Sequence, residues 1–169
     1  MKKRLIAMGM LIAVTFAANV GPVRAASAPK PVNAKKFDTL ANQALDAMKK
    51  RAAELKVTGV AVVSFAAGDA VEGWTSKMAV VGRMKDDPTP TSKGNNLLGI
   101  AYAKSAEMAA TLEDSGTAKR APMTGEFGWQ GGVIAHGKTG YIIVAFSGGK
   151  SEDDVQVSKA GLEVLKSSL

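Results

Sequence analysis

The chain has 169 residues, no cysteine and a formal net charge of +7 at pH 7. The absence of cysteine excludes disulfide bonds, thiol catalysis, cysteine-ligated zinc and covalent attachment of a c-type haem. Lysine and arginine are scattered along the chain after position 25 and form no basic stripe, which argues against nucleic-acid binding.

Residues 1–25 have the organisation of a secretory signal peptide. The cationic start, MKKR, precedes an apolar run and a cleavage site with Val23 and Ala25 at the third and first positions before the cut. An uncleaved membrane anchor is the alternative, because the apolar run is near the lower length limit for a span. Cleavage would remove four of the 22 basic residues and none of the 15 acidic ones, leaving a net charge of +3 and 144 residues. We therefore expect a periplasmic or secreted domain with no membrane span after cleavage.

A linker and a long helix are predicted next. Residues 26–33 contain two prolines and read as a short linker. Asn33 can cap a helix that runs to Lys56. The apolar residues of this helix fall on one stripe at helical spacing: Phe37, Leu40, Ala41, Ala44, Leu45, Met48, Ala52 and Leu55.

The middle of the chain predicts strands and an exposed loop. Residues 57–68 are β-branched and apolar, which is typical of a buried strand. Residues 69–84 form one broken strand or two short ones, of which 78–84 is the better half. Residues 85–96, with their prolines, glycine and polar side chains, are predicted to be an exposed loop.

The last part of the chain predicts two helices that flank a pair of strands. The second helix begins near Asn96 and stops at Gly116, with an apolar stripe made of Leu97, Ile100, Ala101, Lys104, Met108 and Leu112. Residues 117–132 are irregular and rich in glycine, and two apolar strands follow within 133–149. Ser151 starts the final helix as an N-cap, with acidic residues in its first turn. This order predicts a single α+β domain, an antiparallel sheet flanked by helices.

The segment GVIAHGKT, Gly132 to Thr139, matches the pattern of a nucleotide-binding P-loop. A P-loop must open directly into a helix, whose N-terminus faces the phosphates. Here Gly140 and the strand-like run YIIVAF follow instead. The segment is therefore predicted to be a β-hairpin, with HGKTG as its connection.

A second glycine-rich segment, SGGKSEDD at 147–154, precedes a helix and could hold an anion there. The acids Glu152, Asp153 and Asp154 already occupy the positive end of this helix and would repel a phosphate. A strand-to-helix turn with its own cap is the preferred interpretation.

His136, the only histidine, is the one candidate ligand of a metal or haem iron that stands out, and the alternative is a solvated loop residue. One histidine without cysteine or nearby carboxylates in the sequence does not make a transition-metal site. Four methionines are further soft candidates or, alternatively, core residues: Met78, Met84, Met108 and Met123. No G-x-S-x-G motif occurs and nothing in the sequence orients His136 for a catalytic triad, so no catalytic residue is predicted.

The C-terminal half contains five short motifs in order: Gly131-Gly132-Val133, the turn Gly137 to Gly140, Ser147-Gly148-Gly149, the acids 152–154 and Ala160-Gly161-Leu162. With these motifs it resembles the GlcG/HbpS-like family of haem-binding proteins. More loosely, GVAVVSF, MAVVGRM and AYAKSAEMA are similar to the first two strands and the central helix of that family. The first strand here lacks the aspartate and glycine turn that commonly end it there, and the first helix has no histidine.

The resemblance assigns residues 34–169 to a GlcG/HbpS-like domain and implies a profilin-like fold, homo-oligomers, and haem or another tetrapyrrole as ligand. For such a pocket, Trp129 and Phe127 could stack on the macrocycle, Glu126 could hydrogen-bond to its edge, and His136 could be an axial ligand. Aromatic residues in that segment could equally belong to the core or to a subunit interface. The rival function is an oligomeric interaction or structural protein with no small-molecule ligand, and an enzyme comes third.

Overall fold

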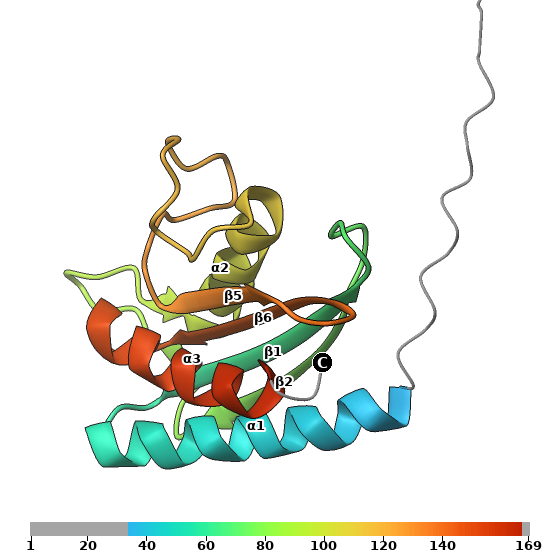
Figure 1. Ribbon diagram of the computed structural model, residues 1–169. Helices are drawn as coiled ribbons and strands as arrows, with labels where there is room; N and C mark the ends of the chain where they lie inside the picture. The colour runs from blue at the N-terminus through green and yellow to red at the C-terminus, as the bar shows by residue number, and fades with distance from the viewer. Residues whose placement is uncertain (1–33, 167–169) are drawn as a thin grey trace, which may run out of the picture.

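A four-stranded antiparallel sheet organises the structure, a computed structural model that describes residues 34–166 (Figure 1). The predicted signal peptide, the linker and the Asn33 cap lie outside the described residues. The elements in chain order are α1 (Ala34–Leu55), β1 (Gly59–Ala67), β2 (Thr75–Val81), β3 (Lys85–Asp86), β4 (Asn95–Asn96), α2 (Leu97–Thr111), β5 (Gly132–His136), β6 (Gly140–Ser147) and α3 (Ser151–Lys166).

The strand order of the sheet is β2-β1-β6-β5, and every neighbouring pair is antiparallel. β1 and β6 are the central strands and are buried on both faces, which explains why their sequences are almost continuously apolar. β2 and β5 form the two edges. The predicted α+β class with an antiparallel sheet flanked by helices is confirmed.

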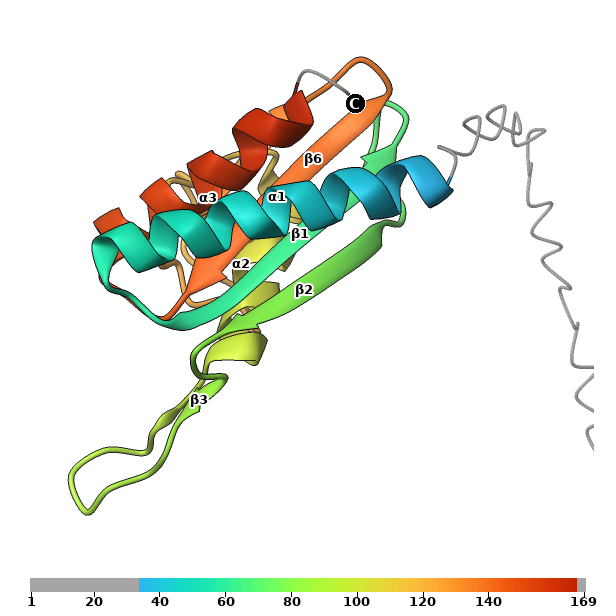
Figure 2. The same cartoon turned by 90° about the horizontal axis from the view of Figure 1, so that it is seen from below.

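The helices cover opposite faces of the sheet, α1 and α3 on one face and α2 on the other (Figure 2). The alternation of side chains along each strand divides the core accordingly. Ala61, Val63 and Phe65 of β1 pack in the cluster under α1 and α3, whereas Val60 and Val62 pack against α2. All eight residues of the stripe predicted for the first helix are buried or partly buried against this core.

Helix α3 packs closely against α1 because Gly161 has no side chain. A Cβ atom added at this position would lie 2.8 Å from both Cγ and Sδ of Met48, which is fully buried. This contact explains a glycine in the interior of a helix, where it otherwise weakens the helix.

Two expectations about α2 and its surroundings are corrected. The helix ends at Thr111, and Leu112 is the C-cap in the left-handed conformation, so Gly116 is not its stop and Leu112 is exposed rather than part of the apolar stripe. The loop predicted at 85–96 is exposed, but its ends pair as β3 and β4 in a short hairpin that extends away from the sheet (Figure 2). Asn96 closes this hairpin and caps α2, since its side chain accepts a hydrogen bond from the backbone N–H of Gly99.

No helix within residues 34–166 is long and apolar enough to cross a lipid bilayer.

Candidate functional site

A cleft of about 200 Å³ opens at one end of the sheet, where the end of β6 meets the beginnings of α2 and α3. Residues 129 and 130, which precede β5, form another part of its wall. Side chains and backbone of twelve residues line it: Asp86, Asn95, Leu97, Ile100, Lys104, Trp129, Gln130, Ser147, Gly148, Gly149, Ser151 and Asp154. The cleft therefore combines one aromatic wall with several polar groups, as ligand sites commonly do.

Lys104 of α2 and Asp154 of α3 form a buried ion pair in this cleft. The two side chains are 3% and 4% exposed, and Lys104 Nζ lies 2.9 Å from Asp154 Oδ2. Lys104 also donates to the backbone oxygen of Phe146 at 2.8 Å, and Asp154 Oδ1 accepts from the N–H of Gly149. The pair joins α2, β6 and the start of α3 across the end of the sheet.

Burial controls the protonation of this pair. Desolvation lowers the pKa of Lys104, and the nearby Asp154 carboxylate opposes this shift only partly. Desolvation likewise raises the pKa of Asp154, against the opposing effects of Lys104 and of the Gly149 and Gly148 N–H groups. Both shifts move the pair towards its uncharged form.

Glycine makes the close packing around the lysine possible. A Cβ atom added at Gly131 would lie 2.2 Å from Lys104 Nζ and 2.8 Å from the Cβ of Asp154. Gly131 also has a positive φ of 133°, which a residue with a side chain rarely adopts. The GGV sequence before β5 therefore lets the backbone pass directly over the ion pair.

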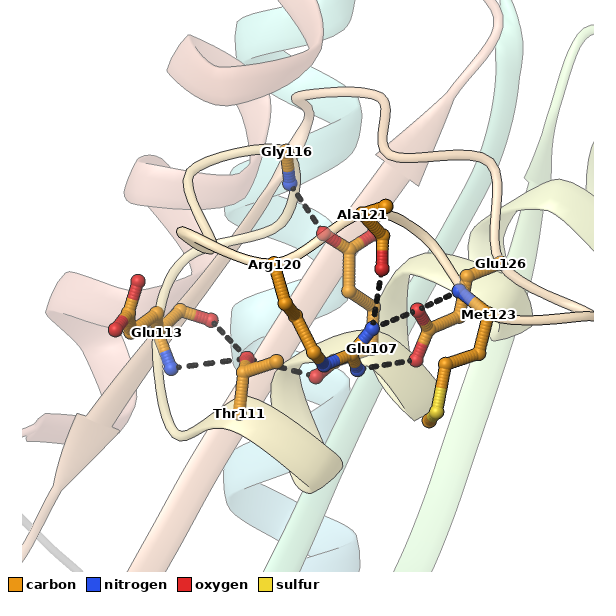
Figure 3. Close-up of polar contacts among 8 residues, drawn as sticks. All are labelled: Glu107, Thr111, Glu113, Gly116, Arg120, Ala121, Met123 and Glu126. Carbon is orange, nitrogen blue, oxygen red and sulfur yellow. Dashed lines mark hydrogen bonds and ion pairs between the residues drawn. The ribbon is translucent and has the colours of Figure 1, made fainter.

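The segment 112–131 forms a long irregular loop beside the cleft, tied to α2 by Glu107. The Glu107 side chain is buried under the loop, and its Oε1 accepts from the N–H of Gly116 at 2.8 Å (Figure 3). Its Oε2 accepts no hydrogen bond within residues 34–166 and is buried. The pKa of the Arg120 guanidinium is raised mainly by its hydrogen bonds to Glu126, and the charge of Glu107 adds to this shift.

Arg120 and Glu126 fix the outer part of this loop (Figure 3). Both terminal nitrogens of Arg120 bond the two oxygens of Glu126 at 2.7 Å, the bidentate geometry that suits a guanidinium and a carboxylate. Glu126 Oε2 accepts a further bond from the N–H of Met123. The bonds from Arg120 and from the Met123 N–H lower the pKa of Glu126 to about 2. Both Glu126 oxygens thus already accept hydrogen bonds inside the loop.

Phe127 and Trp129 lie together on the surface of the loop. Their rings are stacked with centroids 4.7 Å apart and an interplanar angle of 30°. They are 46% and 48% exposed, so neither belongs to the core of this chain. Because Trp129 also lines the cleft, the aromatic pair and the Lys104–Asp154 pair belong to one continuous site.

His136 is the last residue of β5, so it lies at the end of that strand away from the loop that carries Phe127 and Trp129. A five-residue strand spans about 13 Å between its first and last Cα atoms, so His136 is separated from the aromatic loop, which precedes β5 (Figure 1). Its side chain is 51% exposed, its ring meets that of Tyr141 edge-on at 4.6 Å, and its Nε2 lies 3.8 Å from Asp69 Oδ1. The Tyr141 ring therefore packs against His136, whereas the fully exposed Asp69 is too far away for a hydrogen bond.

The remaining sequence motifs have structural roles. β6 follows the loop between His136 and Gly140 directly, so the P-loop-like segment is the predicted hairpin. The second glycine-rich segment is the predicted turn from β6 to α3. Within residues 34–166 no group of three or more histidine, aspartate or glutamate side chains could hold a metal ion. Of the soft candidates, Met108 is buried in the core, whereas Met84 and Met123 are exposed.

Sequence reasoning missed the ion pair. In the sequence, Lys104 is a charged residue within the apolar stripe of α2 and falls in the segment AYAKSAEMA, which is similar to the central helix of the GlcG/HbpS-like family. From the sequence alone, Asp154 is interpreted as one of three acids in the first turn of a helix. The two residues are 50 positions apart, and no local pattern relates them.

Comparison with known proteins identifies the fold alone. No protein-family model and no curated protein sequence matches the chain. The structure is similar to the crystal structure of the Klebsiella pneumoniae protein ORFY, described under the family model DUF336, with a TM-score of 0.51 and 18% sequence identity over 78% of this chain and 90% of that one. DUF336 is the GlcG-like family, so the fold agrees with the resemblance seen in the sequence.

Proposed function

We propose that this protein is an exported binding protein, without catalytic activity of its own, for haem or a similar tetrapyrrole. The observation that carries the proposal is the exposed, stacked pair Phe127 and Trp129, which borders a polar cleft. Two large aromatic side chains on the surface of one loop expose an unusually large apolar area to water, and a flat ligand would cover them. The GlcG-like fold is consistent with this function.

The proposed ligand lies on the aromatic pair rather than inside the protein. The cleft of about 200 Å³ is smaller than the pockets of about 300–1,000 Å³ that enclose drug-sized ligands. It can therefore receive only one edge of a macrocycle, whose face then rests on Phe127 and Trp129. Glu126 and Arg120 keep the loop in shape for this contact.

The iron of a bound haem would have two candidate protein ligands. Met123 is exposed in the same loop as the aromatic pair, and a thioether is an established ligand of haem iron (Figure 3). His136 is exposed at the far end of β5, so a ring that stacks on Trp129 is out of its reach within one chain. A second copy of the chain could bring its own histidine to the site.

A haem titration of purified protein tests the proposal. The chain has two tryptophans, both exposed, so Trp74→Phe leaves Trp129 as the sole reporter and Trp129→Phe leaves Trp74 as a matched control. We expect a saturable Soret change at micromolar haem, with quenching of Trp129 in the first variant. Phe127→Ala with Trp129→Ala should weaken binding by at least about tenfold, equivalent to 1.4 kcal/mol.

The other outcomes assign the ligand elsewhere or reject it. Loss of the Soret change in His136→Ala, with normal binding by the double alanine variant, would move the site to the β5–β6 hairpin. Met123→Leu tests thioether ligation in the same assay. Absence of any Soret change at micromolar haem would reject the haem proposal and favour the interaction protein without a small ligand.

A further inference from the structure

The Lys104 amine has features that its role as an ion-pair partner does not use. An ammonium group offers three N–H donors. Within residues 34–166, two of these are accounted for, by the backbone oxygen of Phe146 and by Asp154 Oδ2. The lysine also lines the cleft, together with Trp129, Ser151 and Asn95. The cleft is therefore lined by a buried lysine and a buried aspartate whose amine and carboxyl groups lie 2.9 Å apart.

The charges around the amine favour transfer of its proton. Burial lowers the pKa of Lys104 and raises the pKa of Asp154, so passing a proton from one to the other costs less than in an exposed pair. The other carboxylate that lines the cleft, Asp86, accepts hydrogen bonds from Asn95 and Arg83, which lower its pKa. Glu107, one turn further along α2, bonds to Gly116 instead. Asp154 is therefore the group placed to exchange protons with Lys104.

We propose that Lys104 is a carbonyl-capture site, at which the side-chain amine condenses reversibly with a small aldehyde held in the cleft, and that Asp154 carries the protons. This goes beyond the binding of a tetrapyrrole, because it is a covalent reaction at the cleft and does not depend on the aromatic pair. The cleft volume of about 200 Å³ suits an aldehyde of a few heavy atoms.

The condensation needs no oxidant, reductant or other co-reactant. Lys104 Nζ first gives a proton to Asp154, and rotation about the Cε–Nζ bond turns the freed lone pair to the cleft. The lone pair forms a bond to the carbonyl carbon, while the electrons of the C=O bond move to the oxygen, which takes the proton from Asp154. The nitrogen then loses a proton to Asp154, and the same proton leaves with the hydroxyl group as water. The product is a protonated imine beside the Asp154 carboxylate, so the pair of opposite charges is restored.

Reductive trapping with propanal and cyanoborohydride tests this at neutral pH. The hydride reduces only the imine and fixes the adduct, which peptide mass spectrometry then locates. Burial lowers the pKa of Lys104, so a larger share of its amine is in the reactive, uncharged form, and we expect Lys104 to be labelled faster than an exposed lysine such as Lys49. Asp154→Asn keeps an acceptor for Gly149 but cannot carry protons, and it should slow labelling of Lys104 at least about tenfold.

The folded wild-type protein decides the outcome. If Lys104 is only a structural ion-pair partner, it will be the least labelled lysine in the folded protein and will react only in denaturant, which would overturn the proposal. Equal labelling of Lys104 in the wild type and in Asp154→Asn would show that Asp154 does not carry the protons, which would overturn that part of the proposal. Lys104→Arg keeps the positive charge, and it should lose the adduct at position 104 while the other lysines are still labelled. The readout is an adduct on one peptide, so it is independent of whether the protein binds haem.

Discussion

The buried pair of Lys104 and Asp154 should be the most sensitive charged contact to remove. Lys104→Met leaves the Asp154 carboxylate buried without its counter-charge, and breaking such a pair typically costs about 3–5 kcal/mol. Replacing Asp154 by asparagine as well removes the stranded charge but keeps an acceptor for the Gly149 N–H. We therefore expect the double variant Lys104→Met, Asp154→Asn to recover most of the loss in urea unfolding.

The exposed pair of Lys49 and Asp46 is the matched control for this experiment. The side chains are 48% and 72% exposed, and pairs of this kind contribute about 0–1 kcal/mol. Lys49→Met should therefore leave the unfolding midpoint nearly unchanged. If Lys104→Met were as mild as this control, the ion pair would not be the contact that joins α2, β6 and α3.

The loop at 112–131 should depend on pH through Glu126. Its pKa is lowered from 4.5 to about 2, mainly by the bonds from Arg120. A group whose pKa is depressed by folding stabilises the folded state above its unfolded pKa, and this contribution is lost as the pH falls through the folded value. The order of the loop should therefore be constant above about pH 4.5 and decline between there and about pH 2.

Carboxyl carbon NMR of Glu126 measures this directly. We expect a titration midpoint near 2 in the wild type and a rise towards 4.5 in Arg120→Gln. Lys119→Gln makes the same change of charge one position away, on an exposed side chain, and should leave the midpoint near 2. A wild-type midpoint near 4.5 would show that the bidentate pair does not form in solution.

The contrast between the sheet and this loop explains how far the sequence could be interpreted. β1 and β6 are long apolar β-branched runs, and the stripe of α1 recurs at helical spacing, so their own residues determine what they form. The loop is ordered by particular bonds between irregularly spaced residues, Glu107 to Gly116 and Arg120 to Glu126, which no periodicity indicates. Leu112 fits the apolar spacing of α2 but is exposed, because the helix ends before it at Thr111.

The candidate site, like the fold, could be predicted from the sequence only in part. The sequence predicts that Phe127 and Trp129 stack on a macrocycle, and in the structure the two rings stack on each other in one loop. Glu126, which was expected at a ligand edge, has its oxygens engaged by Arg120 and Met123, and His136 lies at the other end of β5. Proximity of residues from different elements depends on the tertiary fold, so the sequence could indicate only that neighbours within one loop, such as Phe127 and Trp129, lie close together.

At the level of the whole molecule, exposed apolar side chains occur at both edges of the sheet. Met123, Phe127 and Trp129 belong to the loop before β5, at one edge of the sheet. Val80 lies on β2, the opposite edge, where it is 45% exposed. An unpaired edge strand with an exposed apolar residue is a common site of association between chains. The predicted homo-oligomer and the proposed ligand can therefore use different edges of the same sheet.

This separation gives a prediction that distinguishes the two candidate functions. We expect native mass spectrometry at micromolar concentration to find a homo-oligomer that Val80→Lys converts to monomers, because a charge on an edge strand opposes strand association. Phe127→Ala with Trp129→Ala should leave the oligomer intact while it weakens haem binding.

The rival function predicts the reverse for this double variant. If the aromatic loop is a subunit interface, removing its two rings yields monomers, and the wild type shows no Soret change. A wild type that is monomeric at this concentration would contradict both the association through β2 and the rival function, and would leave ligand binding as the reason for the exposed aromatic pair.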